Sequence, residues 1–97
     1  MFEKLKQFKD LRTKAKSLQS ILAEEKVEGS AAWGKIKMTM NGNQEVLSVT
    51  IDQDLVGNKE KLEGAVKEVT NDAIKKAQKV MANKMMKDGG FKMPGIS

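Results

Sequence analysis

Cationic side chains recur at helical spacing near both ends of this chain. One set comprises Lys6, Lys9, Arg12 and Lys16, and the other comprises Lys75, Lys76 and Lys79. Residues three or four positions apart share one face of a helix, so each set would place several cations side by side. The lysine ammonium is a flexible point charge suited to phosphate, whereas bidentate reading of bases favours arginine. The spacing therefore predicts two surfaces for an anionic partner.

Charge is also sorted along the chain. Residues 1–20 carry a net charge of +4 and residues 73–97 a net charge of +5, whereas residues 21–58 carry −3 and residues 59–72 carry −1. The sequence pI is near 9.5. A basic balance of this kind suits nucleic acid or an anionic surface. We expect a small acidic body with two cationic arms.

Histidine and cysteine are absent, which limits the catalytic and metal-binding chemistry available to the chain. The chain lacks the usual acid/base of neutral pH, a thiol nucleophile and the commonest metal ligands. We therefore expect no enzymatic activity, no small-molecule substrate, no cofactor and no metal. No apolar run reaches the roughly 18 residues of a membrane span, and the first residues do not resemble a signal peptide. A cytoplasmic protein without a membrane partner is expected.

Two segments approach ligand-binding motifs without completing them. Residues 29–35 match the start of a phosphate-binding P-loop, but Ile36 replaces the metal-binding hydroxyl and Lys35 opens a strand pattern instead of a helix. Residues 52–63 match part of a calcium loop, but Val56 offers no side-chain oxygen at a ligand position. We interpret them as a bend between strands and a polar strand-to-helix connection.

Two long amphipathic helices must carry the cations. The first is predicted from about Phe2 to Glu25, with an apolar stripe made of Phe8, Leu11, Ala15, Leu18 and Leu22. The second is predicted to be capped by Asn58 and to end near Lys87. Its stripe consists of Leu62, Val66, Val69, Ala73, Ala77 and Val80. At roughly 43 Å it would overhang strands of roughly 23 Å.

Two lysines indicate where the second helix should extend beyond the sheet. Lys84 and Lys87 continue the apolar stripe of the second helix, and burying an unpaired ammonium costs several kcal/mol. Beyond Val80 we expect this face to lie in solvent or against a partner.

Residues 36–40 and 47–51 alternate apolar and polar side chains, which predicts two strands with one buried face. Asn41 and Gly42 between them predict a tight hairpin with positive φ at both central residues. A third, weaker strand is predicted from Val27 to Trp33.

A chain of 97 residues suits one domain with a thin core, so leftover apolar faces favour a second subunit. Ile74, Met81 and Met85 form a second helical ridge, and Trp33 is a further large apolar residue. We predict that these four residues form a dimer interface. The single domain is predicted to span residues 1–88, with a flexible tail at residues 89–97.

Four segments carry a resemblance by their order and spacing: residues 34–42, 46–52, 71–73 and 90–94. Together they resemble the YbaB/EbfC family of bacterial nucleoid-associated proteins over nearly the whole chain. Trp33 departs from the family pattern, because members tend to carry small residues there.

The resemblance implies an α+β fold with a long N-terminal helix, a three-stranded antiparallel sheet and a long C-terminal helix. It also implies a tweezer-like homodimer that binds double-stranded DNA in the nucleoid through its N- and C-terminal helices. On this sequence, that role falls on the two cationic sets named above. From the residues alone, a protein–protein adaptor and an RNA- or ribosome-associated factor remain alternatives.

Overall fold

Two helices flank a small sheet in the computed structural model, which describes the backbone of residues 2–88 and the side chains of residues 11–87. The elements are α1 (Phe2–Glu24), β1 (Lys26–Ala31), the 3-10 turn η1 (Ala32–Gly34), β2 (Ile36–Asn41), β3 (Val46–Ile51), α2 (Gln53–Val56) and α3 (Lys59–Asp88). The predicted α+β fold is confirmed. The predicted tail at residues 89–97 lies outside the described residues.

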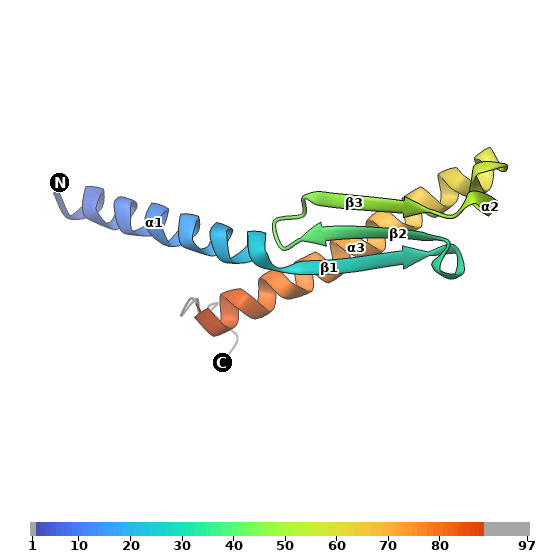
Figure 1. Cartoon of the computed structure of the whole chain (residues 1–97). Helices are drawn as coiled ribbons and strands as arrows, with labels where there is room; N and C mark the ends of the chain where they lie inside the picture. Colours follow the sequence, from blue (N-terminus) through green and yellow to red (C-terminus); the bar gives the residue numbers. More distant parts are fainter. Residues whose placement is uncertain (1, 89–97) are drawn as a thin grey trace.

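The sheet is antiparallel throughout, with strand order β1-β2-β3. Helix α3 crosses one face of it and packs against β1 and β2 (Figure 1). The core lies between them and consists of Ile36, Met38, Met40, Leu55, Ala65, Val69, Ala73 and Ala77. The predicted alternation of β2 is confirmed, because Ile36, Met38 and Met40 are its buried residues on this side.

The contact between α3 and β1 is unusually close. A Cβ atom added at Gly29 of β1 would lie 2.7 Å from the backbone nitrogen of Ala73 and 2.9 Å from the carbonyl oxygen of Val69. Ala73 and Val69 are themselves fully buried. Small residues in β1, which weakened the strand prediction, are therefore what allows the helix to approach the sheet.

Strand β3 is not covered in the same way. Its apolar residues Leu47, Val49 and Ile51 remain 40–48% exposed, although their alternation predicted one buried face. The physical reason is the position of α3, which covers β1 and β2 and leaves the third strand beside it. The apolar face of β3 has no partner element within the described residues.

The hairpin between β2 and β3 differs from the prediction. Positive φ occurs at Gln44 (63°) and not at Asn41 or Gly42. Gly42 instead lies against the end of α1, where its N–H donates to the carbonyl oxygens of Leu22 (2.9 Å) and Glu25 (3.0 Å). A Cβ atom at Gly42 would lie 2.8 Å from the Leu22 oxygen. Close approach, and not turn geometry, requires this glycine.

The rest of this hairpin loop also serves α1. The buried Asn41 side chain accepts hydrogen bonds from the N–H groups of Asn43 and Glu45 (2.9 and 3.0 Å), which holds the loop in shape. Asn43 then donates its side-chain amide to the carbonyl oxygen of Gln19 (2.9 Å). The last four carbonyl groups of a helix lack intrahelical partners. The Gly42 N–H supplies one for Leu22, and the Asn43 amide adds a contact about one turn earlier.

Helix α1 projects away from the sheet beyond this joint (Figure 1). Its bounds agree closely with the predicted Phe2 to Glu25. Along its apolar stripe, Leu22 is buried and Leu18 is partly buried, whereas Ala15 and Leu11 are exposed. The side chain of Phe8 lies outside the described residues. Within the described residues, the stripe is therefore covered near the sheet and uncovered at Leu11 and Ala15.

Helix α3 begins as predicted, because the Asn58 side-chain oxygen accepts a hydrogen bond from the N–H of Lys61 (3.1 Å). Val66, predicted for the buried stripe, is 42% exposed, and Ala65 is buried instead. Lys84 also differs from the expectation for the overhang: it is partly buried and pairs with Glu25 at 3.1 Å. A nearby carboxylate at the end of α1 allows this.

The predicted strand from Val27 to Trp33 is shorter than expected. β1 ends at Ala31, and the chain then turns through Ala32, Trp33 and Gly34, whose φ angles are 52°, 61° and 82°. Left-handed backbone at three successive residues is incompatible with a continuing strand.

No helix within residues 2–88 is both long enough and apolar enough to cross a membrane.

We expect Gly29→Ala to destabilise the fold, because the added methyl group meets backbone atoms of α3 that cannot rotate away. Overpacking of this kind costs about 1–3 kcal/mol, and each kcal/mol lowers Tm by about 4–8 °C in a domain of this size. Thermal unfolding followed by circular dichroism measures the change.

Gly64→Ala is the matched control. Gly64 lies in α3 with open space around its Cα, so alanine should stabilise the helix by about 0.5–1 kcal/mol. An unchanged Tm for Gly29→Ala would show that the close approach does not contribute to stability.

Candidate nucleic-acid interface

The cations predicted on α1 lie on a projecting helix. Arg12 and Lys16 are exposed, and no hydrogen bond or ion pair engages the side chain of either within the described residues. Lys6 and Lys9 belong to the same helix, but their side chains lie outside the described residues. Lys14, which the predicted set omits, is also exposed on α1.

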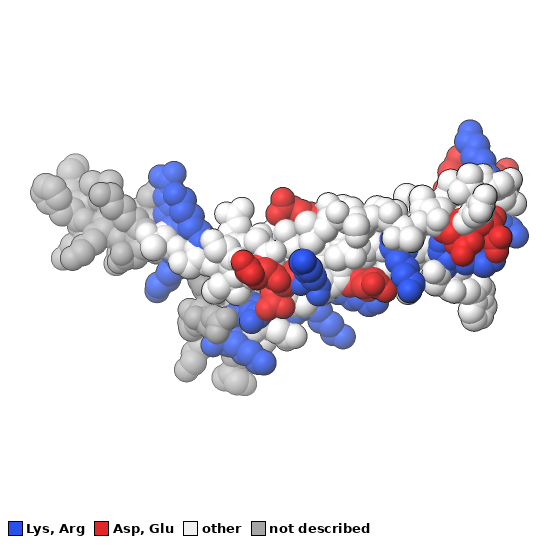
Figure 2. All heavy atoms as spheres, viewed as in Figure 1, with Lys and Arg blue, Asp and Glu red and all other residues white. Residues whose placement is uncertain are grey.

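Two of the three lysines predicted on α3 are similarly disposed. Lys75 and Lys79 stand one helical turn apart, are exposed, and make no ion pair among the described residues. Figure 2 shows blue spheres on α1 and along the length of the molecule, with red spheres over its middle and at the α2 end, where blue spheres also lie. The projecting α1 and the C-terminal half of α3 lie toward the same end of the sheet (Figure 1).

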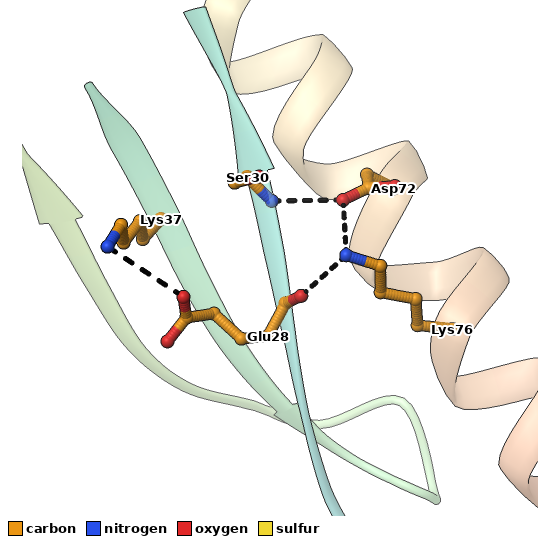
Figure 3. Close-up of polar contacts among 5 residues, drawn as sticks. All are labelled: Glu28, Ser30, Lys37, Asp72 and Lys76. Atoms are coloured by element: carbon orange, nitrogen blue, oxygen red, sulfur yellow. Dashed lines mark hydrogen bonds and ion pairs between the residues drawn. The ribbon is translucent and has the colours of Figure 1, made fainter. Parts of the chain in front are cut away.

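Lys76 differs from its neighbours. Its Nζ donates to the carbonyl oxygen of Glu28 in β1 (2.9 Å) and pairs with Oδ2 of Asp72 at 3.1 Å. The same Asp72 oxygen accepts a hydrogen bond from the N–H of Ser30 (2.9 Å; Figure 3). We refer to this arrangement as the Asp72–Lys76 clamp. Unlike Lys75 and Lys79, Lys76 is therefore engaged within the chain, because the edge of β1 and Asp72 supply partners.

The clamp stabilises the charged form of its carboxylate. The hydrogen bond from the Ser30 N–H lowers the pKa of Asp72, and the hydrogen bond from Lys76 lowers it further. The charges of Lys76 and Lys75 act in the same direction, while partial desolvation opposes them. Sequence spacing could suggest the Asp72–Lys76 pair, since the two residues are four apart. Only the packing of α3 on β1 shows that Ser30 completes it.

The four residues predicted for a dimer interface do not form one surface in this chain. Ile74 packs against the core, and Met81 and Met85 lie partly buried further along α3. Trp33 is fully exposed in η1, which lies at the opposite end of the sheet.

A continuous group of exposed apolar side chains lies on β3, where the alternation of residues had predicted a buried face. We call it the β3 surface; it consists of Val46, Leu47, Val49 and Ile51. All four residues are at least 40% exposed, and no residue of β3 is charged.

The two segments that partly match a P-loop and a calcium loop form connections between elements. Lys35 pairs with Asp54 at 3.4 Å, and the Asp52 carboxylate accepts a hydrogen bond from the Asp54 N–H (2.9 Å) at the start of α2. Within the described part of the chain, no group of three or more acidic residues could hold a metal ion.

Comparison with known proteins adds to this geometry. The model of the YbaB/EbfC DNA-binding family matches residues 1–90. The chain belongs to this family. Two bacterial relatives named nucleoid-associated proteins are each 37% identical to it. The relative from Syntrophobacter fumaroxidans covers 98% of this chain with 89% of its own length, and that from Gloeobacter violaceus covers 95% with 85% of its own.

A solved structure also resembles the fold. The uncharacterized protein HP0035 from Helicobacter pylori superposes with a TM-score of 0.70 at 18% sequence identity, covering 82% of this chain and 95% of that one. The arrangement of helix, sheet and long helix is thus shared with a protein of distant sequence.

The clamp should contribute to stability in a pH-dependent way. A carboxyl group whose pKa is lowered by folding stabilises the native state above its unfolded pKa, and the effect is lost as the pH falls through the folded pKa. We expect wild type to be more stable than Asp72→Asn near neutral pH. The difference should shrink below about pH 3.9 and should not exceed about 1 kcal/mol for this partly exposed pair. Urea unfolding across pH measures it.

Glu68→Gln is the control, because Glu68 is an exposed residue of the same helix, one turn earlier. A difference between wild type and Asp72→Asn that persisted unchanged into strong acid would contradict an ionic contribution from the clamp.

Proposed function

We propose that this protein binds double-stranded DNA as a nucleoid-associated protein, through the exposed cations of α1 and α3. The observation that carries the proposal is the pair of unengaged basic sets, Arg12 and Lys16 on α1 and Lys75 and Lys79 on α3. The same role is proposed for Lys6 and Lys9, earlier on α1. Membership of the family and the names of the relatives support DNA as the partner and the nucleoid as the location.

The contacts are proposed to be mainly with phosphate. Arg12 is the only arginine in the chain, and lysine is poorly suited to bidentate recognition of base edges. Phosphate contacts position a protein on DNA without reading its sequence. Weak sequence preference follows, with affinity set by how many phosphates the two helices neutralise.

Binding is proposed to involve a homodimer, which doubles the number of cationic arms. Two copies would each cover apolar side chains that the single chain exposes. The β3 surface offers the largest such group, and Met81 and Met85, with Ile74 and Trp33 at greater separation, extend the candidate contacts. Isologous association of this kind is the commonest arrangement of soluble oligomers.

Lys76 is given a secondary place in this proposal. Its ammonium group is held by the Glu28 carbonyl and the Asp72 carboxylate, so phosphate would have to compete with both. We therefore assign Lys76 chiefly to holding α3 on β1.

The salt dependence of binding tests the phosphate mechanism. If a dimer neutralises about six to ten phosphates, the affinity should fall about 10³–10⁵-fold between about 50 and 200 mM salt. Fluorescence anisotropy with two unrelated duplexes should give similar slopes, because the contacts are not base-specific. A flat salt response would exclude the mechanism, and preference for folded RNA in competition would favour an RNA-associated role instead.

Charge reversal tests the residues. Lys75→Glu/Lys79→Glu should weaken binding to all duplexes, and the salt slope should fall by about one for each phosphate that is no longer neutralised. Stability should change little, since both side chains are exposed and unpaired among the described residues.

Lys61→Glu/Lys67→Glu makes the same change in net charge elsewhere on α3, where both residues are also exposed. Equal loss of affinity in the two variants would indicate a general charge effect and would move the site away from Lys75 and Lys79.

A further inference from the structure

The sheet has two edge strands, β1 and β3. In an antiparallel ladder, alternate residues turn their N–H and C=O groups toward the neighbouring strand, and the others turn them outward. On β3, Asp52 donates its N–H to the Lys35 carbonyl (2.7 Å), which continues the ladder past the strand end. Val49 and Ile51, at odd positions of the same register, therefore direct their backbone groups outward. This edge is open.

Two of the corresponding groups on β1 are occupied. Its outward residues include Glu28 and Ser30, and α3 side chains take one backbone group of each. Lys76 donates to the Glu28 carbonyl, and Asp72 accepts from the Ser30 N–H, both at 2.9 Å. Figure 3 shows the two side chains reaching from the helix to the edge of the strand. They hold the positions that a neighbouring strand would use.

The close packing of α3 on β1 places the clamp residues at the strand edge. The contact between Ala73 and Gly29 sets the helix directly on β1, so residues on one side of Ala73 reach the strand edge. Asp72 and Lys76 are one turn apart, and their 3.1 Å ion pair joins the two contacts into one unit.

Charge distinguishes the two edges further. Strand β1 carries Lys26 and Glu28, and Glu28 lies 4.0 Å from Lys37 of β2. Strand β3 carries no charged residue and exposes the β3 surface. Charged side chains discourage edge pairing, whereas an uncharged apolar edge invites it.

We propose that the Asp72–Lys76 clamp closes the β1 edge to strand pairing, so that a second copy of this chain associates along β3 alone. The inference rests on the homodimer proposed above and specifies what limits it to two copies. If both edges were open, β1 of one copy could pair with β3 of the next. Such a head-to-tail contact is heterologous, and it grows into open chains unless the rotation between copies closes a ring.

The test is the assembly state of the full-length chain by sedimentation velocity over a range of concentrations. Wild type should be a dimer, whereas Asp72→Ala/Lys76→Ala should form larger species whose share rises with concentration. Adding Ser30→Pro to that double variant should restore the dimer, because proline removes the outward N–H and is tolerated at strand edges. The control is Asn71→Ala/Lys75→Ala, an exposed pair of the same spacing displaced by one residue, which should remain dimeric.

A folded clamp variant that stays dimeric at every concentration would overturn the inference. If wild type is a monomer, the proposed dimer fails, but the clamp is still supported if only the clamp variant associates. If that variant does not fold, the exchange rate of the Ser30 amide hydrogen in the wild-type protein tests the clamp instead. The Ser30 N–H should then exchange as slowly as amides inside the sheet, and rapid exchange would overturn the clamp.

Discussion

The close packing of α3 on β1 is the contact on which the rest of this structure depends. Gly29 lacks a side chain, and Ala73 presents only a methyl group, so helix and strand meet at backbone distance. This contact aligns the buried row from Val69 to Ala77 with the buried residues of β2. It also determines which strands are covered and which side chains reach the sheet edge.

Two consequences of that placement concern partners. Because α3 lies over β1 and β2, the apolar side chains of β3 are left exposed and its outward backbone groups are open. Because the helix lies so near β1, Asp72 accepts from the Ser30 N–H and Lys76 donates to the Glu28 carbonyl, which engages two of the outward groups of that strand. One edge of the sheet is thus suited to association, whereas the other is partly occupied within the chain.

The cationic arms depend on a different joint. The loop between β2 and β3 binds the end of α1 through Gly42 and Asn43, and Lys84 of α3 pairs with Glu25 beside it. From there α1 leaves the sheet with Arg12 and Lys16 exposed, while α3 carries Lys75 and Lys79. Hydrogen bonds and an ion pair at this joint direct α1 away from the sheet, which leaves its cations accessible to a polyanion.

Much of the architecture could be predicted from local patterns. Apolar spacing located both helices to within a residue or two, Asn58 marked the start of α3, and alternation identified β2 and its buried residues. The family resemblance supplied the three-stranded sheet, and the family model confirmed that resemblance. These features depend on interactions between residues close in sequence, or on the pattern of the whole chain.

Tertiary contacts decided the remainder. Periodicity shows that a residue such as Val49 is apolar on one face, but not whether another element covers that face. The sequence placed Lys75, Lys76 and Lys79 in one set, yet Lys76 is drawn to the backbone of a strand that lies far away along the chain. Gly42 was assigned to a turn, although α1 requires it. Helical and strand periods arise from the local backbone, whereas partners distant in sequence are determined only when the elements pack.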